Sequence, residues 1–253
     1  MPLRSYLGGR LFGDLVGGPA PRLIGLHGWG RDHHDLEAGV GDYPRLLVDL
    51  PGFGVSPPPP EPWGAVEYAS CVAAAIDELG QPEPVLIVGH SFGGRVAVCL
   101  AASRPDLVRG MILCGVPLLR SEKTSRPPVV YRLGRRAHRL GLLSDQRFEA
   151  MRRGRGSDDY NAASGVMRGV LVRTVNESYD QQLRAVVCPV GLLWGSGDQA
   201  VPASTIEKVS GLLCTLAAVE IVDGAGHDVH LQAPGSLRAM IEKILEAPRT
   251  VPC

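Results

Sequence analysis

The chain has 253 residues, of which 45% are hydrophobic, and its 26 Lys and Arg side chains balance 26 Asp and Glu. This length and apolar content suffice for one large core, so we expect one domain with an insertion. The balanced charge does not indicate a nucleic acid or an anionic membrane as partner. No apolar run predicts a membrane span or a signal peptide. The six scattered cysteines are expected to be reduced and mostly buried, which favours the cytoplasm.

The predicted elements alternate between strands and helices along most of the chain. Residues 5–16 predict two short antiparallel strands around Gly8 and Gly9. Apolar runs typical of buried strands follow at 23–26, 45–50, 85–88, 108–114, 190–194 and 217–222, and helical spacing at 64–79, beyond residue 92, and at about 234–245. This alternation predicts an α/β fold with a mostly parallel sheet covered by helices on both faces.

The segment 118–183 breaks this alternation. It has helical patterns at 129–142 and 162–175 but no run typical of a buried strand. We therefore predict a core domain formed by 1–117 and 184–253, with 118–183 as a mainly helical cap over the sheet. The segment holds thirteen Lys and Arg against seven Asp and Glu, a net charge of about +6.

Most of these arginines are expected to face water. Arg132, Arg135, Arg136 and Arg139 have spacings that can place three of them on one helical face. The sharper hypothesis is that one of them pairs with an anionic group on a substrate.

One stretch points directly to chemistry. The run Val85-Leu86-Ile87-Val88 leads into Gly89-His90-Ser91-Phe92-Gly93-Gly94, after which a helical pattern begins. A Gly-x-Ser-x-Gly sequence between a buried strand and a helix is the context of a nucleophile elbow, where a serine projects from a tight turn. The alternative is a glycine-rich turn without chemistry.

Two further residues complete a set suited to serine catalysis. Asp198 follows the strand predicted at 190–194, and His227 follows the one at 217–222. Open α/β sheets bind ligands at the carboxyl ends of their strands, where these residues and Ser91 are expected to meet. Ser91 is then the candidate nucleophile, His227 the base and Asp198 the acid that orients the imidazole. Taken singly, Asp198 is also an ordinary turn former and His227 an ordinary loop residue.

On these motifs the chain resembles the α/β-hydrolase superfamily, which uses the same chain order of Ser, Asp and His. The other segments that carry the resemblance are His27-Gly28-Trp29, Asp49-Leu50-Pro51-Gly52-Phe53-Gly54, Gly195-Ser196-Gly197-Asp198 and Gly224-Ala225-Gly226-His227. The resemblance implies an eight-stranded, mostly parallel sheet with helices on both faces and a helical cap. It also implies an oxyanion hole formed by the backbone N–H groups of Trp29 and Phe92.

The remaining candidates are weaker. Trp29, His90, Phe92 and Val201 are candidates for the substrate pocket, although His90 is also expected to pack or hydrogen-bond beneath the elbow. His230 is a minor alternative to His227 as the base. His33 and His34 are expected at the surface or a pocket rim. We expect no metal ion and no organic cofactor. No acidic residue in 115–119 offers an alternative to Asp198.

The expected function is hydrolysis of a small-molecule carboxylic ester, thioester or lactone through an acyl-serine intermediate. A first alternative keeps the three residues and hydrolyses a C–C bond of the meta-cleavage or β-diketone type. Family members of that kind commonly have Trp after the catalytic histidine, whereas this chain has Asp228. A second alternative is a non-catalytic ligand-binding protein, but such proteins often lack a member of the triad and none is missing here.

Overall fold

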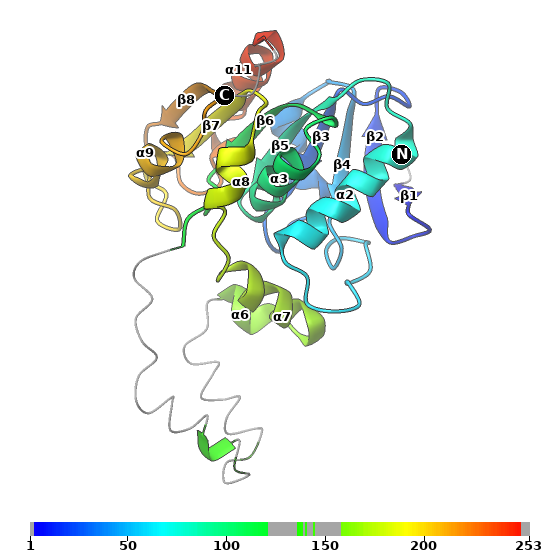
Figure 1. The fold of residues 1–253 in the computed structure, drawn as a ribbon, viewed down its shortest axis with the longest axis vertical. Helices are drawn as coiled ribbons and strands as arrows, with labels where there is room; N and C mark the ends of the chain where they lie inside the picture. Colours follow the sequence, from blue (N-terminus) through cyan, green and yellow to red (C-terminus); the bar gives the residue numbers. More distant parts are fainter. Residues whose placement is uncertain (1–2, 121–135, 139, 141–143, 145–157, 249–253) are drawn as a thin grey trace.

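The computed structural model describes residues 3–120, 136–138, 140, 144 and 158–248. In this part of the chain, eight strands form one sheet in the order β1-β2-β4-β3-β5-β6-β7-β8 (Figure 1). The strands are β1 (Arg4–Tyr6), β2 (Leu11–Val16), β3 (Leu23–Leu26), β4 (Arg45–Asp49), β5 (Val85–His90), β6 (Val108–Cys114), β7 (Val190–Gly195) and β8 (Leu216–Val222).

The sheet is mostly parallel. Strand β2 pairs antiparallel with both β1 and β4, and every other neighbouring pair is parallel. Its central strands are buried on both faces, which explains why they read as continuous apolar runs rather than as alternating patterns. The predicted α/β-hydrolase fold with an eight-stranded, mostly parallel sheet is therefore confirmed.

Helices cover both faces of the sheet. One face packs against α2 (Ala65–Leu79), α3 (Phe92–Ser103), α8 (Asp180–Ala185) and α9 (Thr205–Ser210). The other packs against η1 (His33–Leu36), α1 (Glu37–Val40), α10 (Val229–Gln232) and α11 (Pro234–Glu246). Successive residues of β5 serve opposite cores: Ile87 packs in the first, whereas Leu86 and Val88 pack in the second.

Two further helices, α6 (Asp158–Ala162) and α7 (Gly165–Thr174), lie below the sheet in Figure 1, and α7 contacts the start of α2. Arg173 pairs with Glu67 of α2 at 2.6 Å, and Arg95 of α3 donates to the Thr174 carbonyl at 3.0 Å. The helix predicted over 162–175 is thus found as α7. Of the helix predicted over 129–142, the structure describes 136–138, which are helical, and 140, and the rest lies outside the described residues. The assignment of 118–183 as a cap stays a prediction.

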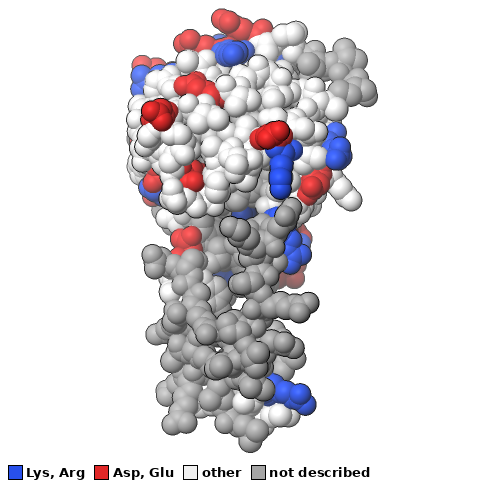
Figure 2. Space-filling model, turned by 90° about the vertical axis from the view of Figure 1, so that its left-hand side faces the viewer, with Lys and Arg blue, Asp and Glu red and all other residues white. Residues whose placement is uncertain are grey.

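The described surface has no single dominant charge on the face drawn in Figure 2, where acidic and basic side chains are interspersed. The five described cysteines are unpaired; four are buried and Cys214 is exposed. No helix within the described residues is both long and apolar enough to cross a membrane.

Two glycines provide a test of how tightly the first turn of α3 packs. A Cβ on Gly93 would lie 2.1 Å from the Leu26 carbonyl oxygen, whereas a Cβ on Gly235, in α11, would meet nothing within 4 Å. We expect Gly93→Ala to lower the free energy of unfolding by about 3 kcal/mol or more, because backbone must shift. Gly235→Ala should raise it by up to about 1 kcal/mol. Urea denaturation measures both, and equal midpoints for the two variants would contradict this packing.

Candidate active site

Ser91 sits on a strained turn between β5 and α3. Its φ is 46° and its ψ −108°, and in the described part of the chain only Leu7 shares a positive φ among residues other than glycine. The turn is held by hydrogen bonds from Ser91 N to Cys114 O and from Gly93 N to His27 O, both 3.0 Å. Neighbouring strands therefore hold the serine in a conformation that its own backbone disfavours.

The structure brings Ser91, His227 and Asp198 together at the carboxyl ends of β5, β8 and β7. His227 Nε2 lies 3.0 Å from Ser91 Oγ, and His227 Nδ1 lies 2.8 Å from Asp198 Oδ2. Asp198 is buried, while Ser91 and His227 are partly exposed. The arrangement leaves the hydroxyl accessible and the carboxylate shielded from water.

Asp198 is held ionised by its surroundings. Burial alone would raise the pKa of its carboxyl group, but hydrogen bonds from His227 and from two backbone N–H groups lower it. Those N–H groups belong to Ala200 and Val201, each 2.8 Å from Oδ1. An ionised carboxylate can only accept, so His227 must donate through Nδ1, and the lone pair on its Nε2 then faces the Ser91 hydroxyl.

Two backbone N–H groups near Ser91 have no protein acceptor among the described residues, those of Trp29 and Phe92. Phe92 is the first residue of α3, so its N–H is one of the helix's unpaired N-terminal donors. Both backbone polar groups of the preceding residue, Gly28, are hydrogen-bonded. Gly28 N donates to Asp35 at 3.0 Å, and Gly28 O accepts from His27 Nδ1 at 2.7 Å. The Trp29 N–H is thus left as a fixed, available donor.

The four residues predicted to line the substrate pocket lie in different surroundings. The Trp29 ring packs edge-on against Phe92, with ring centroids 5.5 Å apart, and Phe92 itself is buried. Val201 lines a cavity of about 760 Å³ that residues 117–120 also line, but Ser91 is not in its wall. The His90 side chain is buried and bonds to Asp35, so it lies beneath the elbow rather than in an open pocket.

The profile of the alpha/beta hydrolase family matches residues 23–239. The chain belongs to this family. It is an α/β-hydrolase enzyme, and its relatives include proteins named as esterases and lipases.

Esterase Rv0045c of Mycobacterium tuberculosis is 28% identical over 252 residues, which cover 91% of this chain and 84% of that protein. Lipase LipV of the same organism is 43% identical over 99 residues, only 38% of this chain and 37% of the lipase. The crystal structure of a meta-cleavage product hydrolase superposes with a TM-score of 0.69 at 20% identity, covering 97% of this hydrolase and 98% of that chain. This last likeness shows the fold alone.

The hydrolase also contains a buried polar cluster that sequence reasoning missed. Asp35 Oδ2 lies 2.9 Å from His90 Nδ1, and Asp35 Oδ1 lies 3.1 Å from His230 Nε2. The two imidazole rings are tilted by 39° to each other, with centroids 4.0 Å apart. His230 is therefore hydrogen-bonded to Asp35 and not to Ser91, so its position does not favour it as an alternative base. Asp35 is 55 residues from His90 and 195 from His230, so no local pattern could reveal the cluster.

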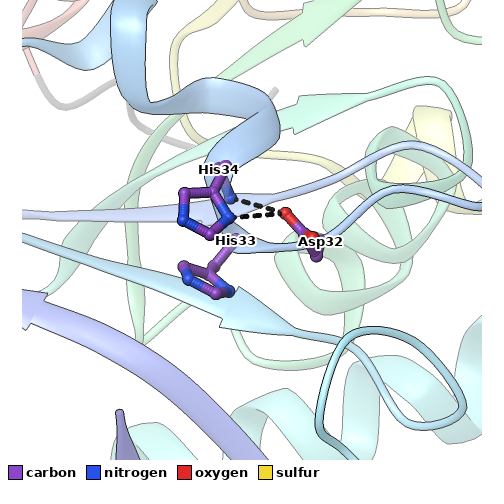
Figure 3. A group of neighbouring side chains, drawn as sticks. All are labelled: Asp32, His33 and His34. Carbon is purple, nitrogen blue, oxygen red and sulfur yellow. Dashed lines mark hydrogen bonds and ion pairs between the residues drawn. The ribbon is translucent and has the colours of Figure 1, made fainter. Parts of the chain in front are cut away.

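A second group of histidines lies at the surface in the η1 turn (Figure 3). Asp32 Oδ1 accepts from His34 N at 2.9 Å and from His34 Nδ1 at 3.0 Å, while the His33 ring lies alongside. His33 Nδ1 bonds to Asp49 at 2.8 Å. Both this group and the Asp35 cluster consist of side chains that can ligate metals. Hydrogen bonding and the capping of η1 by Asp32 account for these contacts, and the absence of a required metal stays a prediction.

The buried histidines predict how stability depends on pH. Burial lowers the pKa of His90 to about 4, against the opposing effect of Asp35, and burial also lowers the pKa of His27. Below about pH 6.5 the unfolded chain therefore binds protons that the folded chain does not. The free energy of unfolding should be highest above about pH 6.5. It should fall as the pH decreases toward about 4, by roughly 1.4 kcal/mol per pH unit for each such histidine.

Urea midpoints at about pH 7, 5.5 and 4.5 measure this dependence. His90→Gln should reduce the slope, whereas the same change at the exposed His34 should leave it unchanged. A midpoint that does not move between these pH values would show that the buried imidazoles titrate normally.

Proposed function

We propose that the enzyme hydrolyses a small-molecule carboxylic ester, thioester or lactone through an acyl-serine intermediate. The observation that carries the proposal is the hydrogen-bonded sequence Asp198–His227–Ser91 on a strained elbow. The available N–H groups of Trp29 and Phe92 support it, because they are the donors an oxyanion requires. In this proposal Ser91 is the nucleophile, His227 the general base and acid, and Asp198 the residue that orients His227.

The first half of the reaction forms the acyl-enzyme. His227 Nε2 removes the Ser91 hydroxyl proton as Oγ attacks the carbonyl carbon of the substrate. The carbonyl oxygen becomes an oxyanion that accepts hydrogen bonds from Trp29 N–H and Phe92 N–H. The carbonyl then re-forms, and the departing alkoxide or thiolate takes the proton from His227. Asp198 stays ionised throughout and stabilises the imidazolium.

The second half returns the enzyme to its starting state. His227 removes a proton from a water molecule, whose oxygen attacks the acyl carbon of acyl-Ser91. The same two N–H groups stabilise the second oxyanion. When it collapses, the ester bond between the acyl carbon and Ser91 Oγ breaks, the carboxylic acid leaves, and Oγ receives the proton that His227 took from water.

Neither alternative has a specific observation in its favour. C–C bond hydrolysis could use the same three residues, but the position after His227 is Asp228, whose carboxylate pairs with Arg31 at 2.8 Å. A purely ligand-binding role does not require a serine hydroxyl, an imidazole and a buried carboxylate in hydrogen-bonded sequence. The relative named as an esterase, matched over 84% of its length, favours the ester reaction.

Selection of an anionic substrate by the 118–183 segment remains a hypothesis. Arg132, Arg135 and Arg139 lie outside the described residues, and Arg136 is exposed. The proposal therefore specifies the type of reaction and not the acyl group or the leaving group of the substrate. A panel of nitrophenyl esters, thioesters and lactones would identify both groups.

Replacing Ser91 with Ala should lower turnover by about 10⁴-fold or more on any substrate of that panel, because it removes the nucleophile. A fluorophosphonate probe should label the wild type and not the variant. Ser103→Ala, at the other end of α3, is the matched control and should keep both activities. Retention of more than about a tenth of the activity by a folded Ser91→Ala enzyme would overturn the proposal.

Asp198→Asn should lower kcat by about 10⁴-fold, because an amide can impose the wrong tautomer on His227. Asp223→Asn is the control: Asp223 is exposed on the loop between β8 and His227 and bonds to Ser196 Oγ at 3.1 Å. Its loss should change kcat less than about threefold. If Asp223→Asn were the more damaging change, the acid would be wrongly assigned.

A further inference from the structure

Asp35 is a buried carboxylate that accepts three hydrogen bonds. Gly28 N donates to Oδ2 at 3.0 Å, His90 Nδ1 donates to the same oxygen at 2.9 Å, and His230 Nε2 donates to Oδ1 at 3.1 Å. The Asp35 side chain and both rings are almost completely shielded from water. The nearest cation, Arg31, has its Nε 3.8 Å from Oδ1 and is partly exposed. The carboxylate therefore depends mainly on the hydrogen bonds from these three donors.

The three donors come from three separate segments, namely the loop after β3, the end of β5 and helix α10, and each adjoins one part of the proposed machinery. Gly28 immediately precedes Trp29, one proposed oxyanion donor. His90 immediately precedes Ser91, and His230 follows His227 by three residues. The Asp35 carboxylate thus accepts hydrogen bonds from all three segments that carry the proposed oxyanion donor, nucleophile and base.

The contact between Gly28 and His90 is close enough to require the glycine. A Cβ on Gly28 would lie 2.6 Å from His90 Nδ1. The residue before the oxyanion donor and the residue before the nucleophile therefore pack directly on each other, with Asp35 Oδ2 accepting from both. Movement of this carboxylate would displace the Trp29 N–H relative to Ser91.

The cluster is not arranged for greatest stability. His90 Nε2 and His230 Nδ1 are buried with no hydrogen-bond partner among the described residues. Each unpaired buried polar atom costs roughly 1–3 kcal/mol. A purely structural role would be served better by apolar side chains at these positions. Local conflict of this kind is expected where a site is constrained by function.

We propose that Asp35 is a positioning residue that holds the Trp29 N–H, Ser91 and His227 in register for oxyanion formation. Asp35 touches none of the reacting atoms and acts through Gly28, His90 and His230. The inference rests on the proposed acyl-serine reaction and names the residue that aligns its parts.

The kinetic test compares Asp35→Ala with Asp32→Ala. Removing Asp35 should lower kcat by about 10- to 100-fold, somewhat less than the complete loss of one oxyanion donor, with KM changed less than about threefold. The inhibition constant of a boronic acid that mimics the tetrahedral intermediate should rise by the same factor as kcat/KM falls. Asp32 caps the same turn, but its side chain bonds to His34 and not to Gly28, His90 or His230, so its variant should keep wild-type kcat.

Asp35→Asn should restore most of the activity. The amide oxygen can accept from Gly28 N and His90, while its NH₂ group donates to His230 Nε2 if that ring adopts the other tautomer. We expect kcat within about fivefold of the wild type. A role confined to overall stability would not produce a loss in kcat alone, a matched loss of boronate affinity and recovery with Asn.

A folded Asp35→Ala enzyme that keeps more than half of the wild-type kcat would overturn the inference, as would equal losses for Asp32→Ala. If Asp35→Ala does not fold, the test is the exchange rate and chemical shift of the Gly28 amide proton, measured in the wild type and in Asp35→Asn. It should be strongly protected from exchange and shifted downfield in the wild type, with an upfield change in the Asn variant; an unchanged resonance would contradict the proposal. This measurement needs no activity, so it stands even if the wild type fails to hydrolyse any ester and the proposed function is lost.

Discussion

The backbone of Ser91 is the constraint on which the rest of the structure depends. A non-glycine residue at φ 46° and ψ −108° costs on the order of 1–3 kcal/mol, so the surrounding structure must hold it. It does so through the sheet: β3 and β6 pair with β5 on either side, and their ends supply the carbonyls of His27 and Cys114 as acceptors. Rigidity of the central strands is thus what allows a hydroxyl to stand above them.

Two buried carboxylates stabilise this edge of the sheet in different ways. Asp198 accepts from two N–H groups of its own loop, so its position is set locally and only His227 is brought from elsewhere. Asp35 takes one donor from Gly28, seven residues earlier in the chain, and the other two from His90 and His230, which are 55 and 195 residues away. Both are ionised acceptors that dictate which imidazole nitrogen carries the proton. The first orients one histidine, and the second aligns whole segments.

This difference explains what the sequence could predict. Ser91, Asp198 and His227 each end a strand-like run, so the periodicity of the sheet and short glycine motifs sufficed to predict their meeting. Asp35 stands in the run Asp32-His33-His34-Asp35, which reads as a polar surface turn. It is buried because the loop after β3, the end of β5 and helix α10 meet around it, and no local sequence pattern encodes that convergence. The two hydrogen bonds of Arg95 could not be predicted for the same reason, because its acceptors, Pro117 O and Thr174 O, are far from it in the sequence.

The contacts of α7 differ in kind from those of the site. Arg173 and Glu67, which join α7 to α2, are each about two-fifths exposed, at 44% and 38% of their side-chain surface. Exposed pairs of this type contribute at most about 1 kcal/mol, whereas losing a partner within a buried hydrogen-bonded cluster costs several times as much. Substitution of the exposed Arg173 should therefore disturb the molecule less than substitutions around Asp35, whereas Val170 of the same helix is fully buried in the main core. It follows that the exposed side of α7 can vary in sequence at little cost to folding, whereas the buried residues around Ser91 and Asp35 cannot.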